Sequence, residues 1–175
     1  MNKKLTLTVT ASMLAALTCI ATMVIKVPTI GTNGYVNIGD TIVLLSMWLM
    51  GNPYGAIAAG IGSGLADLLS GYPSYVPGTV IIKFGMAFVG YIVYKTLNKT
   101  GLNKQLTYVV SGIIAEAIMV IGYFVYEATL LGYGVAAAAS IPSNIVQGVT
   151  CLVLGYLLIN ALSRVGAINN LFERR

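Results

Sequence analysis

The sequence predicts an all-α membrane protein: a six-transmembrane-helix bundle with its N and C termini cytoplasmic. Apolar residues make up 57% of the 175-residue chain and charged residues only 9%. A soluble domain has roughly 45–50% apolar and about 25% charged residues. So few charges cannot cover a surface that faces water, but they suit a surface that faces lipid. Six apolar segments and an uneven distribution of basic residues complete the prediction.

The apolar segments are separated by stretches rich in Gly, Pro, Asn and Thr, which favour turns. They are residues 5–25, 38–50, 54–69, 80–94, 106–126 and 142–162. The first is interpreted as a retained helix, because it is long for a signal peptide and no A-x-A cleavage site follows it. The second is shorter than the roughly 20 residues of a typical span, so it is expected to enter the membrane obliquely. Residues 131–141 are rich in Gly and Ala and predict a loop or a partial helix.

Basic residues set the orientation, because cytoplasmic loops carry an excess of Lys and Arg. With the N-terminus inside, eight of the ten basic residues fall on the inner side: Lys3, Lys4, Lys95, Lys99, Lys104, Arg164, Arg174 and Arg175. The outer loops hold only Lys26, and Lys83 lies within the fourth segment. A different number of spans would remove this asymmetry, so six spans with both ends cytoplasmic are favoured.

Several classes of function are disfavoured by what the chain lacks. It has no histidine, and Cys19 and Cys151 stand alone in apolar runs. Gly55 and Gly60 are followed by Ile61 rather than Lys-Ser/Thr, so there is no phosphate-binding loop and no site for ATP hydrolysis. No nucleophile–base pair or metal-ligand cluster is evident. We therefore expect no enzyme activity, no cofactor and no metal, and the unclustered basic residues argue against a nucleic-acid partner.

Polar side chains inside a membrane are costly and are functional candidates by default. In the predicted bundle they gather in the outer half, with Lys83 about 10 Å and Glu116 about 16 Å below the outer helix ends at ~1.5 Å per residue. Tyrosines in the same half offer flat faces that suit a planar heterocycle. An outward-opening pocket is therefore expected. Its ligand-binding residues are predicted to be Asn37, Asp40, Asp67, Tyr75, Lys83, Glu116, Tyr123, Asn144 and Gln147.

Structural alternatives remain open for some of these residues. Tyr75 would also suit an interfacial aromatic belt. Asp67 and Lys83 would also suit a purely structural ion pair, and Asn144 would suit a cap of the sixth helix. The predicted pocket has more acids than bases and no Arg, which favours a neutral or weakly cationic ligand over a phosphorylated one.

Small residues mark two close-packing patterns. Gly60-x-x-x-Gly64 in the third segment is predicted to pack internally, because glycines let helix backbones approach closely. Ala11-x-x-x-Ala15 in the first segment is predicted to form a face that docks on a partner.

Taken together, several motifs resemble the substrate-binding S components of energy-coupling factor (ECF) vitamin transporters, in the riboflavin-type group. The motifs are Asn37-Ile38-Gly39-Asp40-Thr41, Gly51-Asn52-Pro53-Tyr54-Gly55-Ala56, Gly60-Ile61-Gly62-Ser63-Gly64-Leu65-Ala66-Asp67-Leu68, Gly71-Tyr72-Pro73 and Ile81-Ile82-Lys83. The resemblance implies a multi-pass protein of a prokaryotic plasma membrane with an outward-opening vitamin pocket, capped by the first extracellular loop. It also implies that Ala11 and Ala15 dock on an ECF transmembrane coupling subunit, and that two ATPase subunits supply the energy.

One departure from the family pattern bears on the ligand. Riboflavin-binding members tend to carry Asn-x-x-Lys on the sixth helix, where this chain has Asn144-x-x-Gln147. The difference argues against riboflavin, and the resemblance of the Asn37-Ile38-Gly39-Asp40 block to relatives often assigned to pyridoxine or hydroxymethylpyrimidine favours that branch. The alternatives are a riboflavin-specific S component, a stand-alone ion-coupled carrier that uses Glu116 and Lys83, and a structural membrane protein without a ligand. In the favoured interpretation residues 1–175 form a single integral membrane substrate-binding domain.

Overall fold

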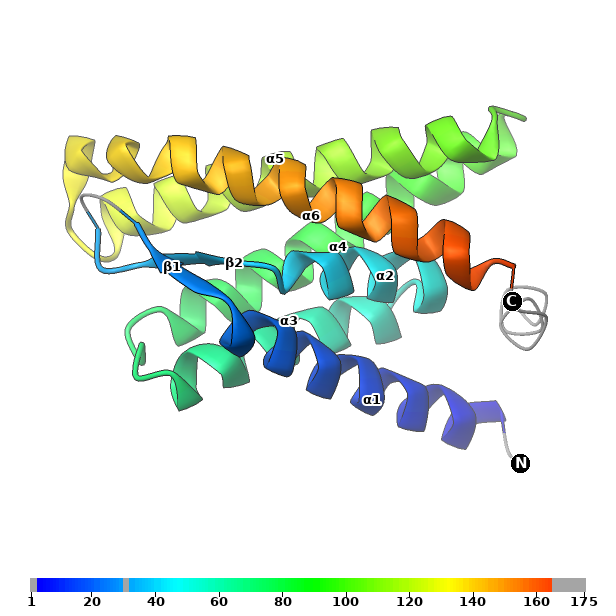
Figure 1. Ribbon diagram of the computed structural model, residues 1–175, viewed down its shortest axis with the longest axis horizontal. Helices are drawn as coiled ribbons and strands as arrows, with labels where there is room; N and C mark the ends of the chain where they lie inside the picture. The colour runs from blue at the N-terminus through cyan, green and yellow to red at the C-terminus, as the bar shows by residue number, and fades with distance from the viewer. Residues whose placement is uncertain (1–2, 30–31, 165–175) are drawn as a thin grey trace.

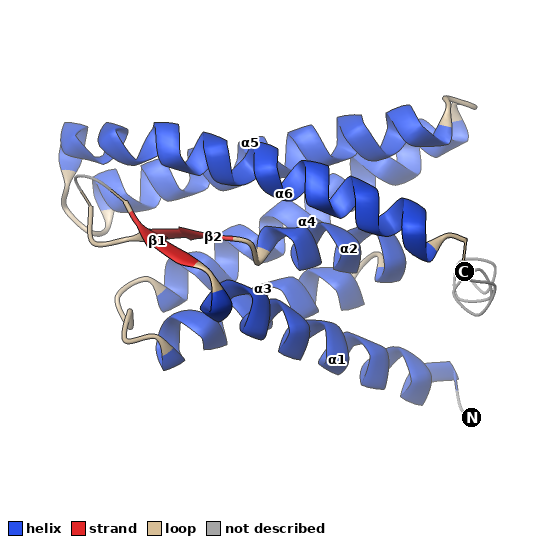
Figure 2. Cartoon of the chain, viewed as in Figure 1, coloured by secondary structure: helices blue, strands red, loops and turns tan. Residues whose placement is uncertain are grey.

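The computed structural model describes residues 3–29 and 32–164. Its α-helices are α1 Lys3–Val24, α2 Asp40–Met50, α3 Tyr54–Leu69, α4 Val76–Lys99, α5 Lys104–Thr129 and α6 Ile141–Leu162. They run side by side along the long axis of the molecule (Figure 1). A 3-10 helix, η1 Gly134–Ser140, precedes α6. Two short strands, β1 Lys26–Pro28 and β2 Tyr35–Asn37, pair antiparallel as a hairpin between α1 and α2 (Figure 2).

The helices match the six predicted segments, but two of them are longer than predicted. The proline-rich stretch 71–78 is not a loop throughout, because α4 already begins at Val76, with Pro77 in its first turn. Proline is tolerated there, since the N–H it lacks would have no partner inside the helix. Likewise α5 begins at Lys104, where the Asn103 side chain caps it by accepting a hydrogen bond from the Gln105 N–H at 2.8 Å.

Four stretches are long and apolar enough to cross a membrane. They are Lys4–Val24, Val76–Lys99, Lys104–Thr129 and Gly134–Leu162. Their outer faces expose large apolar side chains, among them Met13, Ile81, Ile121 and Val146. Such a surface is stable against lipid and unfavourable against water.

Helix α2 is short because it lies inside the bundle. Nine of its eleven residues are buried, and it packs against α1, α3, α4 and α6. A helix that is apolar on all sides is typical of a core position. Leu44, Met47 and Trp48 of α2 form the centre of the hydrophobic core. This segment is therefore a core helix surrounded by the other helices, while its oblique entry into the membrane stays a prediction.

The glycines of α3 allow close helix packing, as predicted. A Cβ atom at Gly62 would collide with the Ala15 carbonyl oxygen of α1. On another face of α3, a Cβ at Gly60 would lie 2.8 Å from the Val80 carbonyl oxygen of α4. The backbone of α3 therefore lies in close contact with the backbones of α1 and α4.

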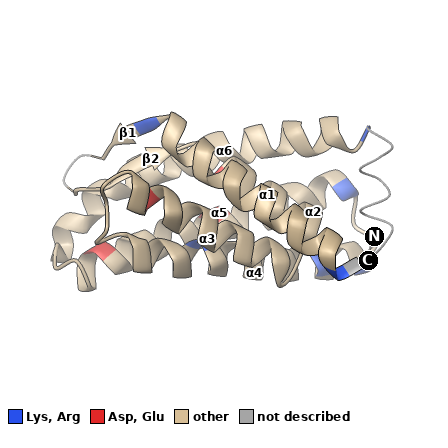
Figure 3. Ribbon diagram, turned by 90° about the horizontal axis from the view of Figure 1, so that it is seen from below, with Lys and Arg blue, Asp and Glu red and all other residues tan. Residues whose placement is uncertain are grey.

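The bundle has two different ends. The start of α1, the α4–α5 connection and the end of α6 lie at one end, while the hairpin and η1 lie toward the other (Figure 1). Basic residues concentrate at the first end (Figure 3), where Lys95 and Lys99 end α4 and Lys104 begins α5. Arg174 and Arg175 lie outside the described residues. Assignment of this basic end to the cytoplasm remains a prediction.

Candidate ligand-binding site

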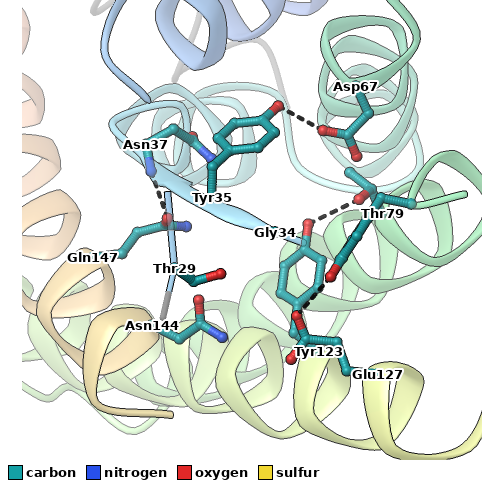
Figure 4. Close-up of a pocket in the computed structure, with 11 residues that line it drawn as sticks. Thr29, Gly34, Tyr35, Asn37, Asp67, Thr79, Tyr123, Glu127, Asn144 and Gln147 are labelled. Atoms are coloured by element: carbon teal, nitrogen blue, oxygen red, sulfur yellow. Dashed lines mark hydrogen bonds between the residues drawn. The ribbon is translucent and has the colours of Figure 1, made fainter. Parts of the chain in front are cut away.

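A small polar cavity lies beneath the β1–β2 hairpin, between α3, α4, α5 and α6 (Figure 4). It is lined by Thr29, Gly34, Tyr35, Asn37, Asp67, Tyr75, Thr79, Tyr123, Glu127, Asn144 and Gln147. Its volume is about 20 Å³, which is room for about one water molecule. A ring-sized ligand therefore requires side chains of the lining to move.

The hairpin forms the roof and is tethered to both sides of the bundle. The Tyr35 hydroxyl donates a hydrogen bond to Asp67 Oδ1 of α3 at 2.6 Å, and the Asn37 N–H donates to Gln147 Oε1 of α6 at 2.7 Å. Burial, reinforced by the neighbouring Asp67 carboxylate, raises the pKa of Tyr35. Its hydroxyl therefore remains a hydrogen-bond donor at neutral pH.

A second acid, Glu127, anchors the wall formed by α5. Its Oε1 accepts a hydrogen bond from the Tyr75 hydroxyl at 3.0 Å, and its Oε2 accepts one from the Ser140 hydroxyl at 2.6 Å. Burial, with a further contribution from Glu127, raises the pKa of Tyr75. Thr79 and Tyr123 are also joined through their hydroxyls at 3.0 Å. Glu127 thus links the start of α4 to the start of α6.

Below the cavity, beyond the lining residue Gln147, lies a buried ion pair. Lys83 Nζ lies 2.5 Å from Asp40 Oδ1, and the two side chains are 3% and 1% exposed. Gln147 Nε2 donates to Asp40 Oδ2 at 2.5 Å. The proposed Asp67–Lys83 ion pair is therefore wrong: Lys83 pairs with Asp40, and the carboxylate of Asp67 accepts from Tyr35 instead.

The structure brings most of the predicted site residues together. Six of them line the cavity directly: Asn37, Asp67, Tyr75, Tyr123, Asn144 and Gln147. Asp40 and Lys83 lie beyond Gln147, and Glu116 faces Gly148 next to it. Asn144 is not the cap of α6, because Ser140 occupies that position. Their roles in binding a ligand stay predictions.

Sequence reasoning did not single out Thr29, Gly34 and Thr79 of the lining. The first two lie in the connection between the strands of the hairpin, and the turn-rich composition of this segment did not predict a hairpin. Thr79 lies in the first turn of α4, which was expected to be loop. Glu127 was absent from the predicted ligand-binding set, although it shares a helical stripe with Tyr123.

A separate apolar groove runs between α1 and α3, outside the bundle core. It has a volume of about 440 Å³ and is lined mainly by small or apolar side chains. They are Thr8, Ala11, Ser12, Ala15, Ala16, Tyr54, Ile57, Ala58, Ile61 and Leu65. The predicted docking residues Ala11 and Ala15 both lie in this groove.

The site holds no arrangement suited to a metal. Among residues 3–29 and 32–164, no three His, Cys, Asp or Glu side chains gather as metal ligands. The buried charged groups in and below the cavity are the acids Asp40, Asp67, Glu116 and Glu127 and the base Lys83. This excess of acids matches a ligand that presents hydrogen-bond donors or a positive charge.

Replacing Tyr35 with phenylalanine is expected to weaken ligand binding about tenfold or more, because the roof loses a hydrogen bond to a carboxylate. Titration of the purified protein with its ligand measures the change. Tyr156→Phe is the matched control, since Tyr156 lies on α6 outside the cavity lining. Equal affinities of wild type and Tyr35→Phe would show that the Tyr35–Asp67 contact does not hold the roof over the ligand.

The fold and the cavity together define a class: proteins with apolar helices long enough to cross a membrane and a small polar cavity at one end of the helix bundle. The chain belongs to the ECF-type riboflavin transporter S component family, whose model matches residues 2–164. S components of this family bind vitamin-type substrates and associate with ECF transmembrane and ATPase modules. They are transporter subunits rather than enzymes, and the ATPase resides in the partner subunits.

Individual relatives are similar over nearly their whole length. An uncharacterized protein from the gap 3' region of Pyrococcus woesei is 35% identical over 154 residues, which cover 85% of this chain and 97% of that protein. The thiamine precursor transporter HmpT of Lactococcus lactis subsp. cremoris (strain MG1363) is 29% identical over 169 residues, which cover 95% and 92%. A solved bacterial ECF transporter S component has the same fold, with a TM-score of 0.68 at 20% identity over 93% of this chain and 98% of that one.

Proposed function

We propose that this protein is the substrate-specificity subunit of an ECF-type importer and binds a B-vitamin-like heterocycle for ATP-driven uptake. Hydroxymethylpyrimidine or pyridoxine is the favoured ligand. The observation that carries the proposal is the polar, acid-rich cavity enclosed beneath the tethered hairpin. The basic end of the bundle would face the cytoplasm, so that this cavity opens outward. The whole chain, residues 1–175, would act as one membrane-embedded substrate-binding domain.

The size and charge of the cavity support a small ring. With a volume of about 20 Å³, the cavity must expand for any vitamin, and a single six-membered ring demands the least displacement of packed side chains. The acids around the cavity favour a ligand with amino or hydroxyl donors over one with a phosphate. The likeness to HmpT, a thiamine precursor transporter, supports the same choice.

Riboflavin is the second candidate, because the matching family model describes riboflavin transporter S components. Its three fused rings require a much larger opening of the lining than a single ring does. In addition, Gln147 occupies the position on α6 at which riboflavin-binding members tend to carry Lys. Its amide group donates a hydrogen bond to Asp40 and accepts one from the Asn37 N–H.

Mass spectrometry of the small molecules retained by the purified protein, followed by titration with each candidate, tests the proposal. Retention of hydroxymethylpyrimidine or pyridoxine, with riboflavin bound more weakly, is the expected result. Uptake of the ligand into vesicles that contain this chain but no ATPase would instead favour an ion-coupled carrier. Failure to bind any of the three compounds would overturn the proposed function.

A further inference from the structure

Glu116 is a buried acid whose carboxyl group has no partner in the fold. Its side chain lies in the middle of α5 and is 6% exposed. Neither carboxylate oxygen has a hydrogen-bond partner among residues 3–29 and 32–164. Each of the other acids of this region has at least one partner: Asp40 contacts Lys83 and Gln147, Glu127 contacts Tyr75 and Ser140, and Asp67 accepts from Tyr35 through Oδ1 while its Oδ2 has none among the described residues. A buried polar group without a partner is costly, so the isolation of this carboxyl group requires an explanation.

The position of Glu116 places it next to the lining of the cavity. A Cβ atom at Gly148 would lie 3.3 Å from Glu116 Oε2, so the missing side chain there leaves room for the carboxyl group. Gly148 follows Gln147, whose Nε2 lies 4.0 Å from the Met119 sulfur, one helical turn further along α5. Gln147 therefore lines the cavity next to the backbone position against which the Glu116 carboxyl group packs. Displacement of the Gln147 side chain would bring a ligand toward this carboxyl group.

The chemistry of the group limits what it can recognise. Asp40 and Lys83 already balance each other's charge, so Glu116 is a surplus acid in a low-dielectric region. A neutral carboxyl group has one O–H donor and one carbonyl acceptor side by side. A ring nitrogen next to an exocyclic amino group offers the complementary acceptor and donor. Two such hydrogen bonds satisfy both oxygens without leaving a net charge in the membrane.

We propose that Glu116 is the specificity-determining residue of this site and pairs with the amino and ring-nitrogen edge of an aminopyrimidine. One oxygen accepts a hydrogen bond from the amino group, and the other shares a single proton with the adjacent ring nitrogen. The inference rests on the proposed function and narrows it. Pyridoxine has no amino group beside its ring nitrogen, and the polar edge of riboflavin presents two carbonyl oxygens around one N–H. Pyridoxine can therefore form only one of the two hydrogen bonds, and riboflavin, whose N–H and carbonyl oxygen could form both, is disfavoured by the larger opening that its three rings require.

The test compares two probes that differ only in the amino group: 4-amino-5-hydroxymethyl-2-methylpyrimidine and 5-hydroxymethyl-2-methylpyrimidine. Each is titrated into the purified protein and its variants. Wild type is expected to prefer the amino compound, and Glu116→Met is expected to weaken its binding by about 10- to 100-fold. Glu116→Gln should stay within about threefold of wild type, because an amide supplies the same donor and acceptor. The compound without the amino group can form only the hydrogen bond at its ring nitrogen, so Glu116→Met should weaken its binding clearly less than that of the amino compound, by no more than about tenfold. Glu116→Gln should change its binding little.

The control is Ser111→Ala, which removes a buried polar group from the same helix where it contacts Trp48 rather than the cavity. This variant should bind both probes as wild type does. Equal losses for both probes in Glu116→Met, or a loss in Glu116→Gln as large as in Glu116→Met, would overturn the assignment while leaving the proposed function intact. Absence of binding of both pyrimidines to wild type, with pyridoxine or riboflavin bound, would also overturn it. If wild type bound none of these compounds, the proposed function would fail as well.

Discussion

Lys83→Met is expected to lower the free energy of unfolding by about 3–5 kcal/mol, because it leaves the buried carboxylate of Asp40 without its cation. Both members of the pair are almost fully buried. Within residues 3–29 and 32–164, the side chain of Asp40 would then keep only the hydrogen bond from Gln147. The same change should abolish measurable ligand binding, since Asp40 of this pair holds Gln147, which lines the cavity. Thermal unfolding in detergent or lipid measures the loss of stability.

The double variant Lys83→Met with Asp40→Leu separates the cost of an unpaired charge from the loss of packing. Replacing both members of a buried pair with apolar residues is often close to neutral for stability. We therefore expect the double variant to recover most of the stability lost in Lys83→Met. If Lys83→Met unfolded at the wild-type temperature, Asp40 would not depend on Lys83 for its charge balance, and the ion pair would have no structural role.

Ala15→Trp is expected to abolish vitamin uptake while leaving ligand affinity within about twofold of wild type. Ala15 lines the groove between α1 and α3, and a large ring there would fill the surface proposed to receive the coupling subunit. The groove lies on a different face from the cavity beneath the hairpin, and the two share no lining residue. Uptake by cells that supply the ECF modules and titration of the purified chain give the two measurements.

Met13→Trp is the matched control for Ala15→Trp. Met13 is on the same helix, is 62% exposed and does not line the groove. A tryptophan at this position would face lipid, so uptake should continue. If Met13→Trp stopped uptake as completely as Ala15→Trp, the effect would come from disturbance of α1 as a whole. Normal uptake by Ala15→Trp would remove the groove as the docking surface.

The local features of the fold could be predicted from the chain alone. Apolar segments of the right length predicted the helices, and α3 has the bounds expected from the composition. The glycine pattern predicted close packing of α3, and the excess of polar groups in one half of the bundle predicted where a cavity lies. Each of these depends on residues that are neighbours along one helix or within one segment.

The partners of the polar groups could not be predicted in the same way. Lys83 pairs with Asp40, 43 residues away, and Gln147 reaches Asp40 across 107 residues. The central position of α2 depends on its packing against helices from other parts of the chain. The hairpin likewise depends on the pairing of β1 with β2 above the cavity.

The sequence by itself therefore determined that this chain is a lipid-facing helix bundle with its costly polar groups at one end. Only the tertiary structure decided which of those groups satisfy one another and that Glu116 has no partner among the described residues. The physical reason is that helix formation and lipid exposure follow from short-range periodicity and composition. Charge pairing at distances of a few ångströms depends on how separate helices are packed together.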